Sequence, residues 1–176
     1  MYQYKYFAFY KPCKTISSLK HINRYVTIKD YVESIESFNL HVVGRLDYNV
    51  SGLILLTNDG KLTNKLTHPY FKIEKIYLVK VHGSPSTLSI LNLCNQNKNI
   101  IKIINIGNTK QKNTWLKVTL RAGKHREIIN TFWGLNTPVL KMIRINFANV
   151  SVYNLLLGHI RKLSLTEIIG LYIQGI

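Results

Sequence analysis

The residues around one carboxylate, Asp47, are compatible with a reactive, ionised side chain. Asp47 follows Gly44-Arg45-Leu46 and comes shortly before an apolar run that begins at Ser51, in a chain with only 8 Asp and Glu against 24 Lys and Arg. A cation beside a carboxylate favours the ionised form, which is able to act as a nucleophile at neutral pH. Spacing alone leaves a second interpretation open, in which Arg45 and Asp47 form a surface pair or Asp47 caps a turn.

Other common kinds of site are excluded by residue spacing. "NDGKLT" lacks the glycine that a phosphate loop needs, because Leu55 occupies that position. The six histidines have no metal-ligand spacing, and Cys13 and Cys94 are too far apart in sequence to suggest a zinc site or a disulfide framework. A hydrolase elbow of the Gly-x-Ser-x-Gly type is missing, and Asp59 belongs to an Asn-Asp-Gly turn. We therefore expect neither a metal nor a cofactor.

The net charge and the length of the chain limit the classes of partner that we expect it to bind. A formal charge of +16 on 176 residues favours an anionic partner, nucleic acid before an acidic membrane, although a compositional bias toward lysine also produces such a charge. No apolar run reaches the roughly 20 residues that span a bilayer. We expect one domain over residues 1–176, a cytoplasmic, reducing location and no membrane contact.

The elements that must position Asp47 follow from periodicity. Strands are expected at 5–11, 51–57, 74–83, 114–120 and 143–147, with a solvated loop over 107–113. Helices are expected at 30–38, around Leu62 and Leu66, after Ser86 with Leu88 and Leu91 on one face, at 125–133 with Gly134 as the stop, and after Ser164. Strands interleaved with short helices predict an α+β domain with a mixed, largely antiparallel central sheet flanked by those helices.

The residues around Asp47 resemble a known family. Gly44-Arg45-Leu46-Asp47 and the run from Ser51 to Gly60, "SGLILLTNDG", are similar to the signature of the RsuA-type pseudouridine synthases, which modify ribosomal RNA. Further matches follow in order: Lys11-Pro12, His68-Pro69, Lys75-x-Tyr77, "VTLRAGKHREI", and a tail with Pro138, Arg144, Gly158, Arg161 and Leu163. The resemblance covers nearly the whole chain. Because the first strand begins at once, the small N-terminal RNA-binding domain of many members is expected to be absent.

The resemblance implies the pseudouridine synthase fold and a cofactor-free isomerase that converts a specific uridine of ribosomal RNA, in the large subunit rather than the small one, to pseudouridine. Asp47 would be the catalytic residue, by attack at C1′ or by proton removal at C2′. Tyr77 would stack on the uracil of a flipped-out nucleotide, its alternative being a buried strand tyrosine. Arg45 would help to hold that nucleotide. Lys75, Lys124 and Arg126 would contact phosphates, their alternative being solvated charges. The partner would be ribosomal RNA or a pre-ribosomal particle, and the protein a monomer.

Some positions depart from the family pattern. A pair of basic residues, the first of which pairs with the catalytic acid in the family, is replaced here by Ile129 and Asn130, and Ala122 replaces a glutamate. Lys14 and Ala148 stand where glycines are common, so a positive φ there would be strained. These departures motivate an alternative function: a catalytically impaired RNA-binding or ribosome-assembly factor on the same fold.

Overall fold

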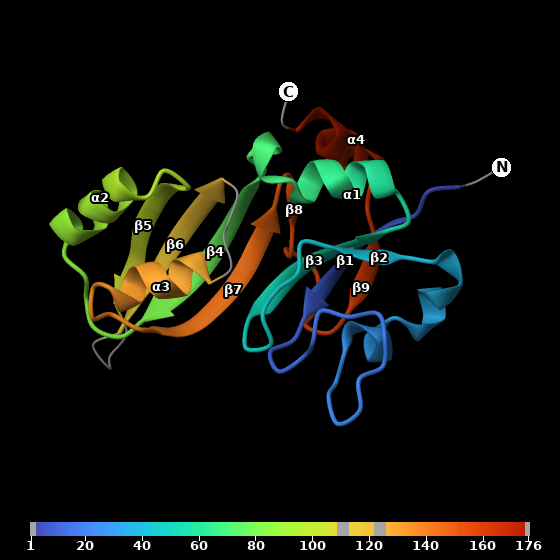
Figure 1. Cartoon of the computed structure of the whole chain (residues 1–176), viewed down its shortest axis with the longest axis horizontal. Coiled ribbons are helices and arrows are strands. Elements are labelled where there is room, and N and C mark those ends of the chain that lie inside the picture. Colours follow the sequence, from blue (N-terminus) through green and yellow to red (C-terminus); the bar gives the residue numbers. More distant parts are fainter. Residues whose placement is uncertain (1–2, 109–112, 122–125, 175–176) are drawn as a thin grey trace.

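The fold is built on one β-sheet (Figure 1). The computed structural model describes residues 3–108, 113–121 and 126–174. Within these ranges nine strands are hydrogen-bonded in the order β5-β6-β4-β7-β3-β1-β9, with β2 added to β3 and β8 to β7. The strands are β1 (Tyr6–Lys11), β2 (His41–Val43), β3 (Ser51–Thr57), β4 (Glu74–Val81), β5 (Ile100–Asn108), β6 (Thr114–Arg121), β7 (Val139–Phe147), β8 (Val150–Ser151) and β9 (Ile160–Lys162).

Short helices flank the two halves of the sheet. They are α1 (Gly60–Thr67), α2 (Thr87–Gln96), α3 (Glu127–Trp133) and α4 (Leu165–Ile173), with 3₁₀ segments η1 (Ile28–Tyr31), η2 (Glu33–Phe38) and η3 (Pro69–Phe71). In Figure 1, α2 and α3 lie against the half made of β4 to β7, whereas α1 and α4 lie beside the half with β1, β2, β3 and β9. No helix in the described ranges is both long enough and apolar enough to cross a membrane.

The strand β3 separates two hydrophobic cores. All seven of its residues are buried. Successive side chains of a strand point to opposite faces, so Ile54 and Leu56 join the core that contains Phe9 and Phe132, while Leu53 and Leu55 join the second core. A continuous apolar run is typical of a strand covered on both faces, and this explains why "SGLILLT" is strongly apolar immediately after Asp47.

The loop that carries Asp47 leaves the sheet where two strands share one edge of β3. The end of β3 pairs with β2 through Val43 and Leu55, and its start pairs with β7 through Gly52 and Arg144, the latter in parallel. Gly52 has φ +131, and a Cβ there would lie 2.8 Å from the Arg144 Cα and nearer still to its backbone nitrogen and oxygen. Only glycine permits this approach. The two halves of the sheet therefore meet beside Asp47.

Most expected elements are confirmed. The strand 51–57 has the expected bounds, and the other strands differ by a few residues at their ends. Every strand pair except β3–β7 is antiparallel, which confirms the mixed, largely antiparallel sheet. Ser164 and Glu167 form the expected capping box at α4. The expected loop is shorter, because β5 extends to Asn108, and residues 109–112 lie outside the described ranges.

One helix prediction needs correction. The segment 30–38 is two 3₁₀ pieces, because the Asp30 carboxylate accepts hydrogen bonds from the backbone N–H of Thr27 at 2.7 Å and from its hydroxyl at 3.1 Å. Asp30 thus closes a short turn that begins at Ile28. The helix expected after Ser86 is confirmed as α2, in which Leu88 and Leu91 are both exposed and Leu93 enters the core.

The strain expected at Lys14 and Ala148 is present. Lys14 has φ 58 and Ala148 has φ 52, the left-handed region in which a Cβ is unfavourable. The chain therefore adopts this backbone conformation at both positions at some cost in stability.

Candidate active site

Asp47 lies on a loop between β2 and β3 that is anchored on both sides. Leu46 and Val50 are buried, and the Val50 N–H donates to the Asp47 carbonyl oxygen at 3.0 Å, closing a turn. Gly44 begins the loop with φ +71, and a Cβ there would lie 2.6 Å from the Phe147 ring. The Asp47 side chain remains 32% exposed. Its carboxylate is thus held at a surface by apolar neighbours that cannot leave the core.

A second loop, which follows β1, is hydrogen-bonded to the Asp47 loop. The Ser17 hydroxyl donates to the Leu46 carbonyl oxygen at 2.7 Å and accepts from the Leu46 N–H at 3.1 Å. The Lys14 N–H donates to the Tyr48 carbonyl oxygen at 2.8 Å. These bonds fix the backbone on both sides of Asp47 to residues about 30 positions earlier in the chain.

A buried arginine, Arg144, supports the site from β7. It is 1% exposed, donates from Nε to the Leu53 carbonyl oxygen at 2.7 Å and from Nη2 to the Gly44 carbonyl oxygen at 2.5 Å, and lies 5.0 Å from the Phe147 ring centre. Burial lowers the pKa of the Arg144 guanidinium, and the nearby Tyr77 side chain opposes that shift. One guanidinium thus joins the Asp47 loop and β3.

Two lysines add positive charge around this arginine. Lys11 is fully buried, and its Nζ donates to the carbonyl oxygens of Pro12 at 2.9 Å and Thr15 at 2.7 Å. Burial is the main cause that lowers the pKa of Lys11 to about 8, and Arg144 lowers it further while Cys13 and Asp47 raise it. Burial, with the charge of Arg144, also lowers the pKa of Lys75 to about 8. A concentration of cations at a concave surface favours an anionic ligand.

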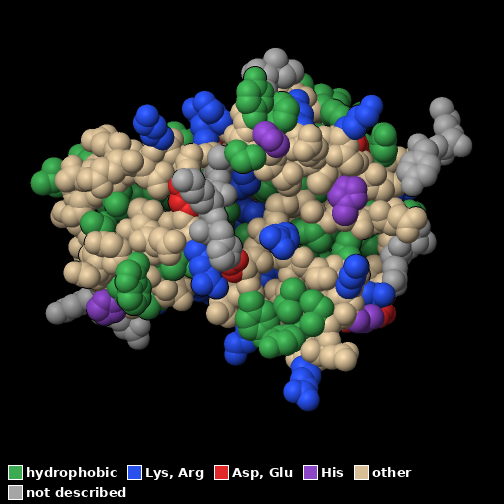
Figure 2. All heavy atoms as spheres, viewed as in Figure 1, with side chains coloured by type: hydrophobic (Ala, Val, Ile, Leu, Met, Phe, Trp, Pro, Cys, Tyr) green, Lys and Arg blue, Asp and Glu red, His purple; other side chains and the backbone are tan. Residues whose placement is uncertain are grey.

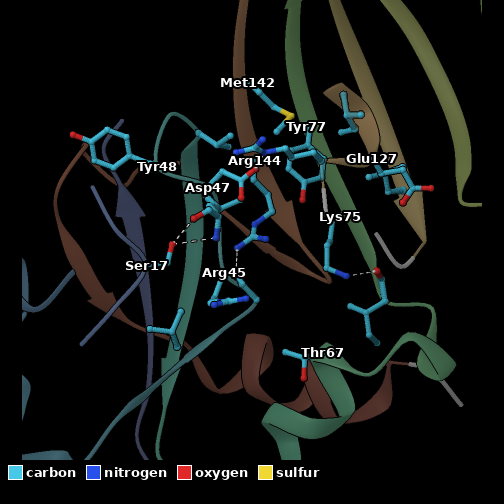
Figure 3. Close-up of a pocket in the computed structure, with 18 of the residues that line it drawn as sticks. Ser17, Arg45, Asp47, Tyr48, Thr67, Lys75, Tyr77, Glu127, Met142 and Arg144 are labelled. Carbon is cyan, nitrogen blue, oxygen red and sulfur yellow. Dashed lines mark hydrogen bonds and ion pairs between the residues drawn. The ribbon is translucent and has the colours of Figure 1, made fainter. Parts of the chain in front are cut away.

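Ser17, Asp47, Lys75 and Arg144 line a cleft of about 740 Å³ (Figure 3). A volume in this range is typical of small-molecule and cofactor sites. Five of the six site residues expected from the sequence line the cleft, and the sixth, Lys124, lies outside the described residues. The five are Arg45, Asp47, Lys75, Tyr77 and Arg126.

The five residues differ in exposure. Tyr77 is 8% exposed in the β4 wall, opposite Arg144 in the strand register, so it is both a buried strand tyrosine and part of the cleft. Arg45 lies exposed at the cleft lip. Lys75 is partly buried and donates to the Ile73 carbonyl oxygen at 3.3 Å, so its role as a solvated surface charge is not supported.

The structure pairs Asp47 with Arg126. The Arg126 Nε lies 3.8 Å from the Asp47 Oδ2, and the Arg126 side chain is 60% exposed. Arg126 is the N-cap of α3, where φ is 54, and the cleft wall that α3 contributes continues through Glu127 and Ile128. A cation therefore reaches Asp47 from the residue three positions before Ile129.

Sequence reasoning did not single out three residues of this site. Arg144 and Lys11 appear only among the matches to the family pattern, and no pattern points to Ser17. A charged residue inside an otherwise apolar strand, such as Arg144 between Ile143 and Ile145, was the available signal, because strand interiors exclude unpaired charge. Within the described ranges, no group of three or more His, Cys, Asp and Glu residues is arranged to hold a metal ion.

Comparison with known proteins identifies the family. A model described as RNA pseudouridylate synthase matches residues 5–132. The chain belongs to the RNA pseudouridylate synthase family. This pseudouridylate synthase homologue is 31% identical over 171 residues to "Ribosomal large subunit pseudouridine synthase B" of Bacillus subtilis (strain 168), covering 93% of this chain and 69% of the relative. It is 34% identical over 154 residues to the protein of the same name from Buchnera aphidicola subsp. Baizongia pistaciae (strain Bp), covering 84% of this chain and 62% of that relative.

The fold comparison agrees with the family. A structure described as "Crystal structure of pseudouridylate synthase" superposes with a TM-score of 0.81 at 24% identity, covering 97% of this chain and 75% of that one. The pseudouridine synthase fold is therefore confirmed. The chain spans 69% of the Bacillus subtilis relative and about 60% of the Buchnera aphidicola ones.

Proposed function

We propose that this chain isomerises a uridine of ribosomal RNA, in the large subunit, to pseudouridine. The observation that carries the proposal is the placement of Asp47 in a nucleotide-sized cleft, with Arg126 3.8 Å from its carboxylate and Tyr77 in the wall. The names of the relatives, which are large-subunit pseudouridine synthases, support ribosomal RNA as the substrate. We further propose that residues 1–176 act as one catalytic domain and as a monomer.

Asp47 acts as the catalytic residue in this proposal. The bond between C1′ and N1 of the uridine breaks, the base turns, and a bond between C1′ and C5 forms, while the C5 proton is lost and N1 gains a proton. Atoms and electrons balance without a cofactor. The carboxylate acts at the ribose, and its exposed fraction of 32% leaves it accessible to a nucleotide that has left its stack.

The cleft residues hold the substrate. Tyr77 provides a flat ring whose rotation is limited by burial, which suits stacking on uracil. Arg45 and Arg126 lie exposed at the lip and contact the nucleotide or its phosphates, and Lys75 contributes charge from inside the cleft. Lys124 is proposed as a further phosphate contact from the family pattern.

The test is direct. The purified protein is incubated with large-subunit ribosomal RNA and with pre-ribosomal particles, and pseudouridine is mapped chemically. The wild type is expected to modify one site and Asp47→Asn none, with both proteins equally stable in urea. Because the Arg45 side chain lies exposed, Arg45→Gln is the matched control for a charge change on the same loop and is expected to reduce the rate without abolishing it. Absence of any new pseudouridine with wild type would contradict the proposal.

A non-catalytic RNA-binding or assembly factor is the second candidate, favoured by Ile129 and Asn130 in place of the basic pair. In cells, this candidate predicts that Asp47→Asn leaves growth and ribosome profiles unchanged, whereas Lys75→Glu and Arg126→Glu damage both. The enzymatic proposal predicts that Asp47→Asn removes one pseudouridine from the ribosomal RNA of the same cells.

A further inference from the structure

An exposed aromatic surface borders the cleft, and the proposed chemistry does not use it. Tyr25 is 54% exposed and Tyr48 40%, and their rings meet edge to face with centroids 5.9 Å apart. Ile22 and Val26 beside Tyr25 are exposed as well. We name these four residues the rim platform. Figure 2 shows apolar side chains gathered on this face over the loops between β1 and β3. Contiguous exposed apolar surface marks an interaction site more often than isolated exposed residues do.

The rim platform is continuous with the cleft and fixed to it. Tyr48 directly follows Asp47 and lines the cleft. The Lys14 N–H bonds the Tyr48 carbonyl oxygen, and the Ile16 N–H donates to the Val26 carbonyl oxygen at 2.9 Å. The loop that carries Tyr25 is therefore joined by backbone bonds to the loop that carries Asp47, so both rings keep a defined position relative to the carboxylate.

The positive charge around the rim platform indicates which class of partner it binds. Residues 13–29 contain Lys14, Lys20, Arg24 and Lys29 and no acidic residue. The acid that follows this segment, Asp30, lies 3.2 Å from the His21 Nδ1 and bonds to Thr27, and Asp47, which precedes Tyr48, lies 3.8 Å from the Arg126 Nε. Exposed aromatic rings among positive charges match single-stranded nucleic acid, which has flat bases and a polyanionic backbone.

Base flipping explains why such a surface would lie at this rim. When a nucleotide leaves its stack to enter a cleft, its neighbour loses a stacking partner. An aromatic ring at the rim is able to replace that partner, whatever the neighbouring base, because every base has a π-face.

We propose that Tyr25 and Tyr48 stack on the RNA base adjacent to the flipped uridine, with Lys20 and Arg24 contacting the phosphates beyond it. This inference rests on the proposed function and adds to it the recognition of the flanking nucleotide. It assigns substrate binding to the loop after β1, in which the resemblance identified no RNA-binding residue.

A measurement of RNA binding tests this proposal independently of catalysis. The 176-residue chain carrying Asp47→Asn is titrated into a fluorescently labelled oligouridylate and into an abasic ribose-phosphate oligomer of the same length, and binding is followed by fluorescence anisotropy. The parent is expected to bind the oligouridylate about tenfold more tightly than the abasic oligomer. Tyr25→Ala and Tyr48→Ala are each expected to remove most of that preference and to leave affinity for the abasic oligomer unchanged, whereas Tyr25→Phe retains it.

The control is Tyr153→Ala, which removes a tyrosine that is 81% exposed on the loop after β8 and is expected to change neither affinity. An unchanged preference in Tyr25→Ala would overturn the inference. So would tyrosine-dependent binding to vesicles of anionic phospholipid with no effect on the oligouridylate. Loss of the preference in Tyr25→Ala, together with no pseudouridine formed by wild type on ribosomal RNA, would instead support the platform and contradict the proposed isomerase.

Discussion

The Nη2 of Arg144 lies 2.5 Å from the carbonyl oxygen of Gly44, which is separated from it by 100 residues in sequence and precedes Asp47 by three. The same side chain donates to the Leu53 carbonyl oxygen. The position of the Asp47 loop therefore depends on these two bonds, and we assign Arg144 as a positioning residue in the proposed enzyme.

Replacement of Arg144 by Lys is expected to lower kcat by about 100-fold and the free energy of unfolding by about 2–4 kcal/mol. A lysine cannot donate to the Gly44 and Leu53 carbonyl oxygens in the geometry of the guanidinium fork, which leaves a buried acceptor unsatisfied. Single-turnover kinetics and urea unfolding measure the two effects. A positioning role is contradicted if the folded variant retains wild-type kcat, since a purely structural residue would change only the unfolding.

Arg126 is expected to supply the cation that Ile129 does not. Arg126→Gln removes the charge 3.8 Å from Asp47 and should lower kcat by about tenfold to 100-fold, with little loss of stability because the side chain is 60% exposed. Arg126→Lys should retain part of the activity.

Ile129→Arg in the wild-type background is expected to leave kcat within a factor of about three, because the α3 residues in the cleft wall are Glu127 and Ile128. A large gain from Ile129→Arg would show that the site lacks its cation.

Activity is expected to fall above pH 8. The pKa of Lys75 is lowered to about 8 by burial and by Arg144, so the cleft loses positive charge as the pH rises through that value. The RNA then binds less tightly, and kcat/KM should show a descending limb near pH 8. In Lys75→Arg the charge persists at high pH, and the limb should weaken or move upward. An unchanged limb in that variant would assign the titration to another group.

The same lysines should make the protein more stable as the pH rises. Lys11 and Lys75 have pKa values of about 8 in the folded state, against 10.5 unfolded, so above pH 8 the unfolded state binds more protons and the free energy of unfolding increases with pH. Between pH 7.5 and 9.5 we expect a gain of about 1–3 kcal/mol in urea unfolding. In Lys75→Met this gain should shrink by about half. If the free energy of unfolding of the wild type stays constant or falls over this pH range, the lowered pKa values of Lys11 and Lys75 are contradicted.

Ala148→Gly is expected to stabilise the fold by about 1 kcal/mol, which corresponds to about 2–4 °C in Tm. Ala148 has φ 52, and glycine adopts this conformation without strain. Thermal unfolding measures the change, and Ala8→Gly, in the middle of buried β1, should destabilise instead. A lower Tm for Ala148→Gly would mean that the packing of the methyl group outweighs the backbone strain.

Local patterns in the sequence predicted most of the elements. A continuous apolar run that ends at a turn predicted β3, alternation predicted β6, and the Ser164–Glu167 capping box predicted the start of α4, because these signals depend on residues within a few positions of one another. They failed at 30–38, where the Asp30 carboxylate selects a 3₁₀ turn, and they did not show that the face of α2 with Leu88 and Leu91 is exposed.

By itself, the sequence determined that Asp47 follows an arginine in a glycine-started loop before a buried strand, in a strongly basic chain. Only the tertiary structure decided which cations surround that carboxylate. Arg144 reaches Gly44 and Leu53 because Gly52 lets β7 approach β3, and Arg126 reaches Asp47 from the start of a helix 79 residues later. The physical reason is that strand pairing and close backbone approach act between segments remote in the chain, where residue spacing carries no information about distance.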